Sequence, residues 1–198
     1  METLVFLGRT LGFSFAAGIN LYATVALLGL ASHYGWVALP DEYRAFDNPW
    51  IIGIALFLYV VEFFADKIPW VDSAWDTLHT LIRPLGGALI ALTTLGEASP
   101  AVETMVALLG GSVAASTHFT KAGTRVVANA SPEPFSNWFL SIAEDLFVVG
   151  LGYLALAHPI AALTIVALLL VVIAASAAWI VRALRQRFGR GRRQAVPG

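Results

Sequence analysis

The sequence predicts an all-α protein, a polytopic bundle of transmembrane helices, and three observations support this prediction. Of the 198 residues, 58% are hydrophobic and only 13% are charged, with a mean hydropathy of +0.75, whereas an ordinary soluble domain is about 25% charged. Six segments are apolar enough to be membrane helices, and the basic residues gather in alternate connections between them. This composition excludes a soluble enzyme, a nucleic-acid-binding protein and a disordered regulator.

The predicted spans follow from the length that a bilayer requires, about 20 mostly apolar residues per helix. The second and third spans are short, and the amphipathic stretch Pro69–Arg83 between them predicts an interfacial or re-entrant helix. Pro84, Gly86 and Gly87 follow directly, so we expect a broken segment near residues 69–95. The six spans are Leu11–Ala31, Trp50–Phe64, Leu85–Leu95, Ala101–Thr120, Trp138–Ala157 and Ile160–Val181.

The distribution of basic residues predicts the topology. With six spans and a cytoplasmic N-terminus, every one of the 12 Lys and Arg residues except Arg44 lies on the cytoplasmic side, as the positive-inside rule requires. We therefore expect one transmembrane domain over residues 1–183 with both termini in the cytoplasm. The Arg-rich residues 184–198 are expected to form a basic cytoplasmic tail that contacts anionic lipid headgroups.

The six spans divide into two halves of three, over about residues 10–95 and 101–183. Because three is odd, a duplicated half would insert in the opposite orientation. Residues 16–22 (AAGINLY) can be aligned with residues 114–120 (AASTHFT), which pairs Asn20 with His118, and the second helix of each half carries an acid, Glu62 or Glu144. We therefore expect a 3+3 inverted repeat.

Ionisable side chains inside predicted spans are the candidate functional groups, because each costs roughly 2.5–3.5 kcal/mol at the bilayer centre. Acids occur in the second and fifth spans, and a basic face with i, i+3, i+7 spacing occurs in the fourth. These charges either form static ion pairs or line a solvated pathway. The candidate transport or ion-binding residues are Glu62, Asp66, Glu144, Asp145, Asn20 and His118, and the candidate anion-attracting residues are Lys121, Arg125 and Arg83.

A second polar stripe lies on the amphipathic segment. Asp72, Asp76 and His79 follow one another at spacings of four and three residues, and two carboxylates with an imidazole are suitable ligands for a divalent ion. The alternative is that this stripe is the solvated face of an interfacial helix. We predict no cofactor.

Two stretches, AAGINLYATVALLGL and VEFFADKIPWVDSAWDTLHTLIRP, carry a resemblance to a known family. The chain resembles DUF4126, a family of bacterial membrane proteins with no assigned function, from about Phe13 to Leu156, most distinctively over Glu62–Pro84. The resemblance implies a multi-pass protein of the bacterial inner membrane. It supplies neither a substrate nor catalytic residues.

Three hypotheses about function remain open. The first is a small transporter or channel for a small ion or an anionic solute, with intramembrane carboxylates as coupling or ion-binding groups and a homodimer as one way to enclose the pathway. The second is a membrane-embedded enzyme acting on a lipid phosphate, although no recognised motif of such enzymes is present. The third is a structural or partner-binding membrane protein.

Overall fold

The computed structural model describes residues 1–37, 39–129 and 134–194, and all regular structure within them is helical. Each of the five helices from α3 to α7 begins with a proline, whose fixed φ and missing N–H suit the first turn of a helix. The elements are α1 (Glu2–Ile19), α2 (Leu21–His33), the 3₁₀ helix η1 (Asp41–Phe46), α3 (Pro49–Ala65), α4 (Pro69–Leu95), α5 (Pro100–Asn129), α6 (Pro134–Ala157) and α7 (Pro159–Gln194).

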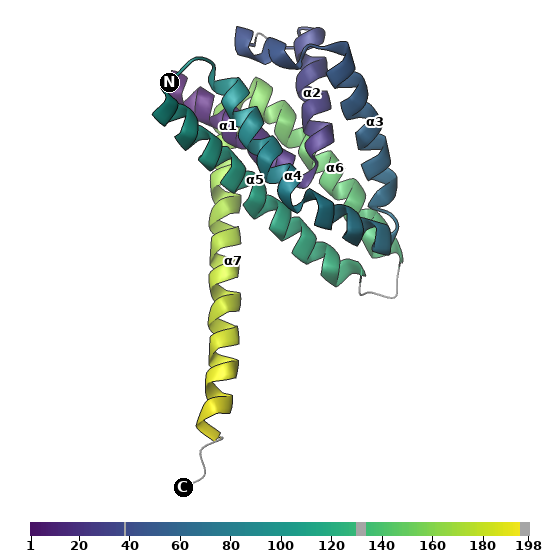
Figure 1. Cartoon of the computed structure of the whole chain (residues 1–198), viewed down its shortest axis with the longest axis vertical. Coiled ribbons are helices and arrows are strands. Elements are labelled where there is room, and N and C mark those ends of the chain that lie inside the picture. The colour runs from purple at the N-terminus through teal and green to yellow at the C-terminus, as the bar shows by residue number, and fades with distance from the viewer. Residues whose placement is uncertain (38, 130–133, 195–198) are drawn as a thin grey trace.

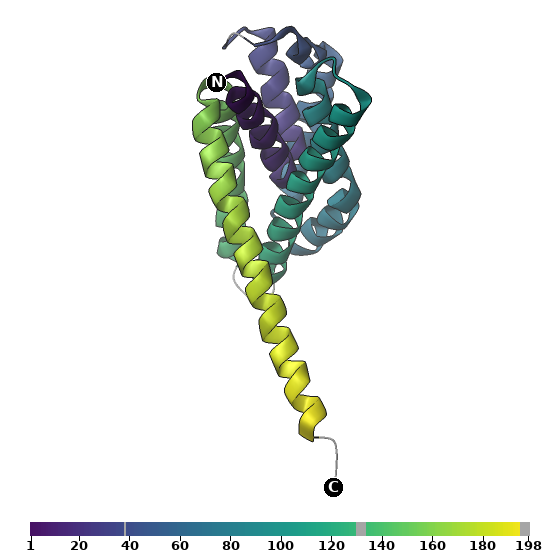
Figure 2. The same cartoon turned by 90° about the vertical axis from the view of Figure 1, so that its left-hand side faces the viewer.

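The helices α3 to α7 run alternately between two ends of the bundle, whereas α1 and α2 do not cross it (Figure 1). One end, here called the η1 end, holds the N-terminus, η1 and the start of α7; the opposite end holds the turn between α3 and α4. Helix α1 enters from the η1 end, and α2 returns to it (Figures 1 and 2). The C-terminal part of α7 projects beyond the bundle at the opposite end.

The prediction of one unbroken span over Leu11–Ala31 is wrong, because the chain breaks at Asn20. Its backbone is extended, with φ −145° and ψ 99°, between the end of α1 and the start of α2. Its side-chain oxygen accepts a hydrogen bond from the Ala23 N–H at 2.9 Å, which caps α2. A single polar residue inside an apolar segment thus divides two helices.

The predicted broken segment near residues 69–95 is also wrong, because α4 is one helix of 27 residues with Pro84 inside it. Its polar stripe is buried, while Leu78 and Leu81 on the other side are 63% and 73% exposed. The amphipathic pattern was interpreted with the polar face toward water. A helix that faces lipid instead directs its polar face toward the protein interior. The predicted amphipathic pattern of α4 is therefore correct, but its polar face points into the bundle and its apolar face points outward.

Three helical segments are long and apolar enough to cross a membrane, Pro69–Leu95, Phe135–Ala157 and Pro159–Ala183, and α2 and α3 are shorter apolar helices. Large exposed hydrophobic side chains occur on most helices. These features indicate a membrane protein. The count of six spans and the inverted repeat stay predictions. The two predicted halves begin differently, because the first has the break at Asn20 and the second begins with the continuous helix α5.

Helix α1 lies at the centre of the bundle, in contact with α4, α5, α6 and α7. Phe13, Ala16 and Ala17 on it have no exposed surface. At Gly18 the backbone approaches α5 so closely that a Cβ atom would collide with the carbonyl oxygen of Ala114. This close crossing brings the end of α1, and therefore the break at Asn20, against the basic face of α5.

Candidate functional site

The charged residues predicted inside the membrane come together in one place, here called the buried network. It lies where α3, α4, α5 and α6 meet beside the break between α1 and α2. Every member except Glu144, whose side chain is 14% exposed, is buried. The network consists of the acids Glu62, Asp66, Asp72, Asp76, Glu144 and Asp145 and the bases Arg83, Lys121 and Arg125, with Asn20, His79 and His118 among them.

Arg83 of α4 joins three helices. Its Nη2 donates to Glu62 Oε1 of α3 at 2.7 Å, and its Nη1 donates to Asp76 Oδ1 of α4 at 3.1 Å. The same Nη1 lies 2.9 Å from His118 Nδ1 of α5. Because a guanidinium only donates hydrogen bonds, this contact makes His118 Nδ1 the acceptor.

Lys121 of α5 occupies the point where α1 ends. Its Nζ lies 3.0 Å from Asp66 Oδ2, 3.6 Å from Glu62 Oε1 and 3.5 Å from Glu144 Oε2. It also donates to the backbone carbonyl of Ile19 at 3.2 Å. That carbonyl belongs to the last turn of α1, where carbonyl groups lack partners within the helix, so the lysine both neutralises acids and caps the broken helix.

Arg125, one turn further along α5, binds α3 and α6. Its Nη2 donates to Asp66 Oδ2 at 3.0 Å and to Glu144 Oε2 at 2.6 Å. Its Nε adds a bond to Glu144 Oε1 at 3.3 Å, so the pair with Glu144 is bidentate. Its Nη1 donates to Asn137 Oδ1 at 2.8 Å.

Asp145 differs from the other acids of the network. It accepts a hydrogen bond from Asn20 Nδ2 at 3.2 Å, and its Oδ2 is buried without a hydrogen-bond partner. Among the described side chains, no Lys, Arg or His nitrogen lies within 4.0 Å of its carboxylate. Asn20 therefore connects the break between α1 and α2 to an acid that forms no ion pair within 4.0 Å in the described residues and that Lys67 and Lys121 influence only from further away.

The three residues of the stripe predicted as a metal site each have different partners. Asp72 accepts from Asn129 at 2.7 Å, Asp76 accepts from Arg83, and the two ring nitrogens of His79 contact the Trp75 carbonyl and the Tyr22 hydroxyl. In residues 1–37, 39–129 and 134–194, no three His, Asp or Glu side chains lie in a group that could hold a metal ion. The metal site stays a prediction, and the described residues do not supply a group of ligands for it.

The charges of the buried network do not balance. Over the part of the chain that the structure describes, six carboxylates of the network face its three permanent cations, and the half-buried Lys67 beside it interacts with Asp66 and Asp145. Two negative charges therefore remain in excess when both histidines are neutral. Glu62 Oε2, Asp66 Oδ1 and Asp145 Oδ2 are buried carboxylate oxygens without hydrogen-bond partners. Unpaired carboxylates are costly to bury, so the arrangement favours the uptake of positive charge as protons or cations.

Two cavities reach the buried network from different directions. One of about 200 Å³ lies between α4 and α5 and is lined by Asp76, His118 and Arg125. The other, of about 320 Å³, lies between α1, α5, α6 and α7 and is lined by Lys121 and Glu144. The network is therefore reachable on both faces of α5.

The sequence analysis missed a polar stripe on α6. Asn137, Ser141 and Asp145 are spaced four residues apart and are all buried. Asn137 holds Arg125 and also donates to the Asp66 carbonyl at 3.0 Å. The signal was present, because residues at i, i+4 and i+8 share one face of a helix, but only the two acids of this segment were considered.

The comparisons with known proteins agree with the resemblance inferred from the sequence. No curated protein and no solved structure is detectably similar to this chain. The model of one family, described as "Domain of unknown function (DUF4126)", matches residues 7–179. The match covers most of the chain, so the protein belongs to the DUF4126 family.

Proposed function

We propose that the protein is a small transporter or channel that moves a monovalent cation, H⁺ or Na⁺, through the buried network. The observation that carries this proposal is the surplus of buried carboxylates over permanent cations beside a broken helix. Charged residues inside a membrane mark ion and proton pathways when they exceed what pairing requires. Asp145 is the best candidate for the cation-binding group, because the Asn20 amide is its only hydrogen-bond partner among the described residues.

The pairing of the basic residues argues for a cation as the substrate. Arg83, Lys121 and Arg125, which the sequence analysis assigned to attracting an anion, each lie within 4 Å of at least two carboxylates. Their charge is already compensated, so an anionic solute would have to displace acids held at 2.6–3.1 Å. A cation needs only the unpartnered carboxylate oxygens.

The break between α1 and α2 gives independent support. Transporters commonly bind coupling ions where a membrane helix is interrupted, because free carbonyls and helix ends there supply ligands and partial charges. Here the end of α1 directs the Ile19 carbonyl at Lys121, and the Asn20 side chain contacts Asp145. The interruption and the surplus of acids thus occur at the same point.

The transport proposal is tested by ion flux into liposomes that contain the purified protein. An imposed H⁺ or Na⁺ gradient should dissipate faster than in protein-free liposomes, and Asp145→Asn should slow this flux at least tenfold, because it removes a charge and keeps the shape. The matched control is Glu97→Gln, which changes an exposed acid at the η1 end. If wild-type flux is no faster than in empty liposomes, or if Asp145→Asn and Glu97→Gln give equal flux, the buried network consists of structural ion pairs and conducts no ion.

We also propose a topology that differs from the predicted one. If α1 and α2 enter and leave on the same side, α3 to α7 make five crossings and the chain ends lie on opposite sides. Lys67 belongs to the turn between α3 and α4, and Arg182 and Arg185 belong to the C-terminal part of α7. Both segments lie at or beyond the end opposite to η1 (Figure 1), so that side is cytoplasmic by the positive-inside rule. Only the N-terminal segment with Arg9 changes sides relative to the six-span prediction.

Cysteine labelling checks this topology directly, because the natural sequence contains no cysteine. In intact cells, an impermeant thiol reagent should label Thr3→Cys, whereas Ala183→Cys should react only after permeabilisation; both positions are exposed. Labelling of both positions only after permeabilisation would restore six spans and two cytoplasmic ends.

A further inference from the structure

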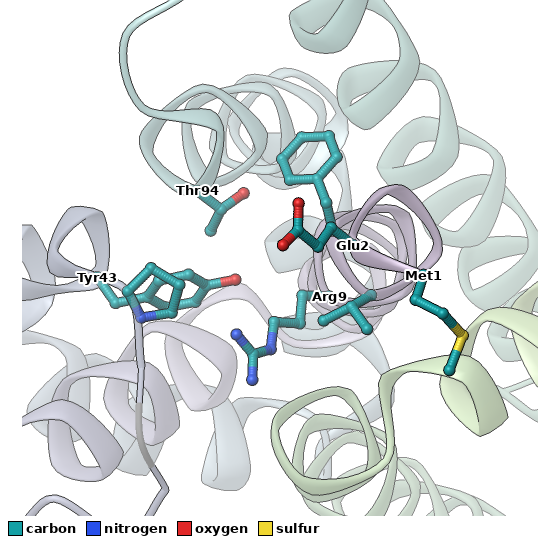
Figure 3. A pocket seen from close by; sticks show the side chains of 8 residues that line it. Met1, Glu2, Arg9, Tyr43 and Thr94 are labelled. Carbon is teal, nitrogen blue, oxygen red and sulfur yellow. The ribbon is translucent and has the colours of Figure 1, made fainter.

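A cavity at the η1 end has a different character from the buried network. It has a volume of about 340 Å³ and lies between the first turns of α1, the chain around η1 and the end of α4. Figure 3 shows the polar side chains on its walls, with the Tyr43 hydroxyl directed into it. The cavity is lined by Met1, Glu2, Val5, Phe6, Arg9, Pro40, Tyr43 and Thr94.

Arg9 is the basic side chain of this cavity, and it forms no ion pair with a described acid. Over the described residues, no carboxylate lies within 4.0 Å of its guanidinium. Its protein hydrogen bond is a long one, from Nη2 to the Leu156 carbonyl at 3.5 Å, and its Nε is buried without a partner. A guanidinium has five N–H donors in a planar fork, so most of its donors are unused.

Tyr43 supplies the second polar group. The guanidinium carbon of Arg9 lies 6.0 Å from the centre of the Tyr43 ring, so the two side chains are neighbours. The Tyr43 side chain is 2% exposed, and burial raises the pKa of its phenol. The hydroxyl therefore stays neutral and keeps its proton for donation. The Thr94 hydroxyl is already engaged, because it donates to the Ala91 carbonyl at 3.0 Å and lies 3.2 Å from the Thr10 hydroxyl.

The other walls are mostly apolar, and the η1 end carries exposed tryptophans. Met1, Val5, Phe6 and Pro40 provide the apolar surface. Trp36 and Trp50, close in sequence to η1 and the start of α3, are 55% and 80% exposed. Exposed tryptophans collect at the level of lipid headgroups, so this cavity lies where headgroups and the first part of their acyl chains meet the protein.

We propose that this cavity binds the phosphate group of an anionic phospholipid, with Arg9 as its cationic anchor and Tyr43 as a hydrogen-bond donor. The phosphate oxygens accept from the free guanidinium N–H groups and from the phenol, and the apolar wall contacts the glycerol and the start of the acyl chains. The site is separate from the buried network, so it stands whether or not the protein moves ions.

Substitution of Glu2 tests the proposal through an expected gain of binding, whereas substitution of Arg9 tests it through a loss. Its carboxylate lines the same cavity, and the residue is exposed. A negative charge there repels a phosphate, so Glu2→Gln should strengthen binding while Arg9→Gln weakens it. A role of Arg9 that is only structural predicts no gain from Glu2→Gln.

The experiment measures lipid binding to the delipidated full-length protein by native mass spectrometry. The probes are phosphatidylglycerol, zwitterionic phosphatidylcholine and inorganic phosphate. We expect phosphatidylglycerol to bind in preference to phosphatidylcholine, with affinity at least tenfold lower in Arg9→Gln, several-fold lower in Tyr43→Phe and several-fold higher in Glu2→Gln. Arg44→Gln is the matched control, because Arg44 is an exposed base in η1 at the same end, paired with Asp41.

Each outcome either distinguishes a phospholipid from inorganic phosphate as the ligand or contradicts the proposed site. Binding of inorganic phosphate that needs Arg9 and matches the affinity for phosphatidylglycerol would assign the site to free phosphate. Equal phosphatidylglycerol affinity in wild type, Arg9→Gln and Glu2→Gln would overturn the proposal. If Arg9→Gln fails to fold, Arg9→Lys and Glu2→Gln still test it, because the lysine keeps the charge and should retain most of the binding.

Discussion

The buried network and the η1-end cavity differ in how their basic side chains are paired with acids. In the network, each base lies within 4 Å of at least two carboxylates, and acids still outnumber bases. At the η1 end, Arg9 faces a cavity without an ion-pair partner among the described residues. The first arrangement favours added positive charge and the second favours an anion, so the two proposals give one bundle two sites of opposite preference.

The comparison also distinguishes basic side chains that the fold needs for stability from basic side chains that are available to bind a ligand. A base enclosed by acids cannot be removed cheaply, because its carboxylates are left buried and unpaired. A base without acids leaves nothing unpaired when it is replaced. Substituting the two kinds of base by the same apolar residue should therefore have very different effects on stability.

The largest expected effect is that of Arg125→Met. This change removes the shortest ion pair of Glu144, at 2.6 Å, and one of the two 3.0 Å pairs of Asp66. It should lower the free energy of unfolding by roughly 3–5 kcal/mol. Arg9→Met is the matched control and should change it by less than about 1 kcal/mol. Unfolding of both variants in mixed detergent measures the difference. Similar losses in the two variants would mean that the two regions are not energetically distinct.

A smaller effect is expected when the two asparagine helix caps are compared. Asn20 caps α2 while its amide holds Asp145, whereas Asn48 only caps the exposed start of α3. Asn20→Ala should cost roughly 2–3 kcal/mol, because it removes a cap and leaves a buried carboxylate without its donor, and Asn48→Ala about 1 kcal/mol. The same unfolding assay compares them. Equal losses would show that the bond from Asn20 to Asp145 contributes nothing to stability.

Much of the network could be predicted from the sequence because charge inside an apolar segment is conspicuous. Glu62, Lys121 and Arg125 were recognised in this way, and the structure brings them together. The pair between Arg83 and Glu62 could not be predicted, because it joins residues 21 apart on different helices. Which acid meets which base depends on how the helices cross, and the sequence periodicity of a single helix carries no such information.

The two errors in the helix boundaries have one physical origin. Pro84 and the adjacent glycines were expected to break a helix, but a membrane helix tolerates proline when neighbouring groups satisfy the freed backbone. The span Leu11–Ala31 was expected to be continuous, yet the chain breaks at Asn20, whose side-chain oxygen accepts the Ala23 N–H at the start of α2. In both cases residue type alone does not decide whether the helix breaks. Arg9 was overlooked because a lone base near the N-terminus looks like an ordinary topology signal.

The length of α7 has a consequence of its own. Its 36 residues measure about 54 Å from end to end, against a hydrocarbon layer about 30 Å thick. The apolar part ends at Ala183, and the eleven helical residues that follow add about 16 Å. The position of Gln194 relative to the apolar part is therefore fixed by the rise of a continuous helix.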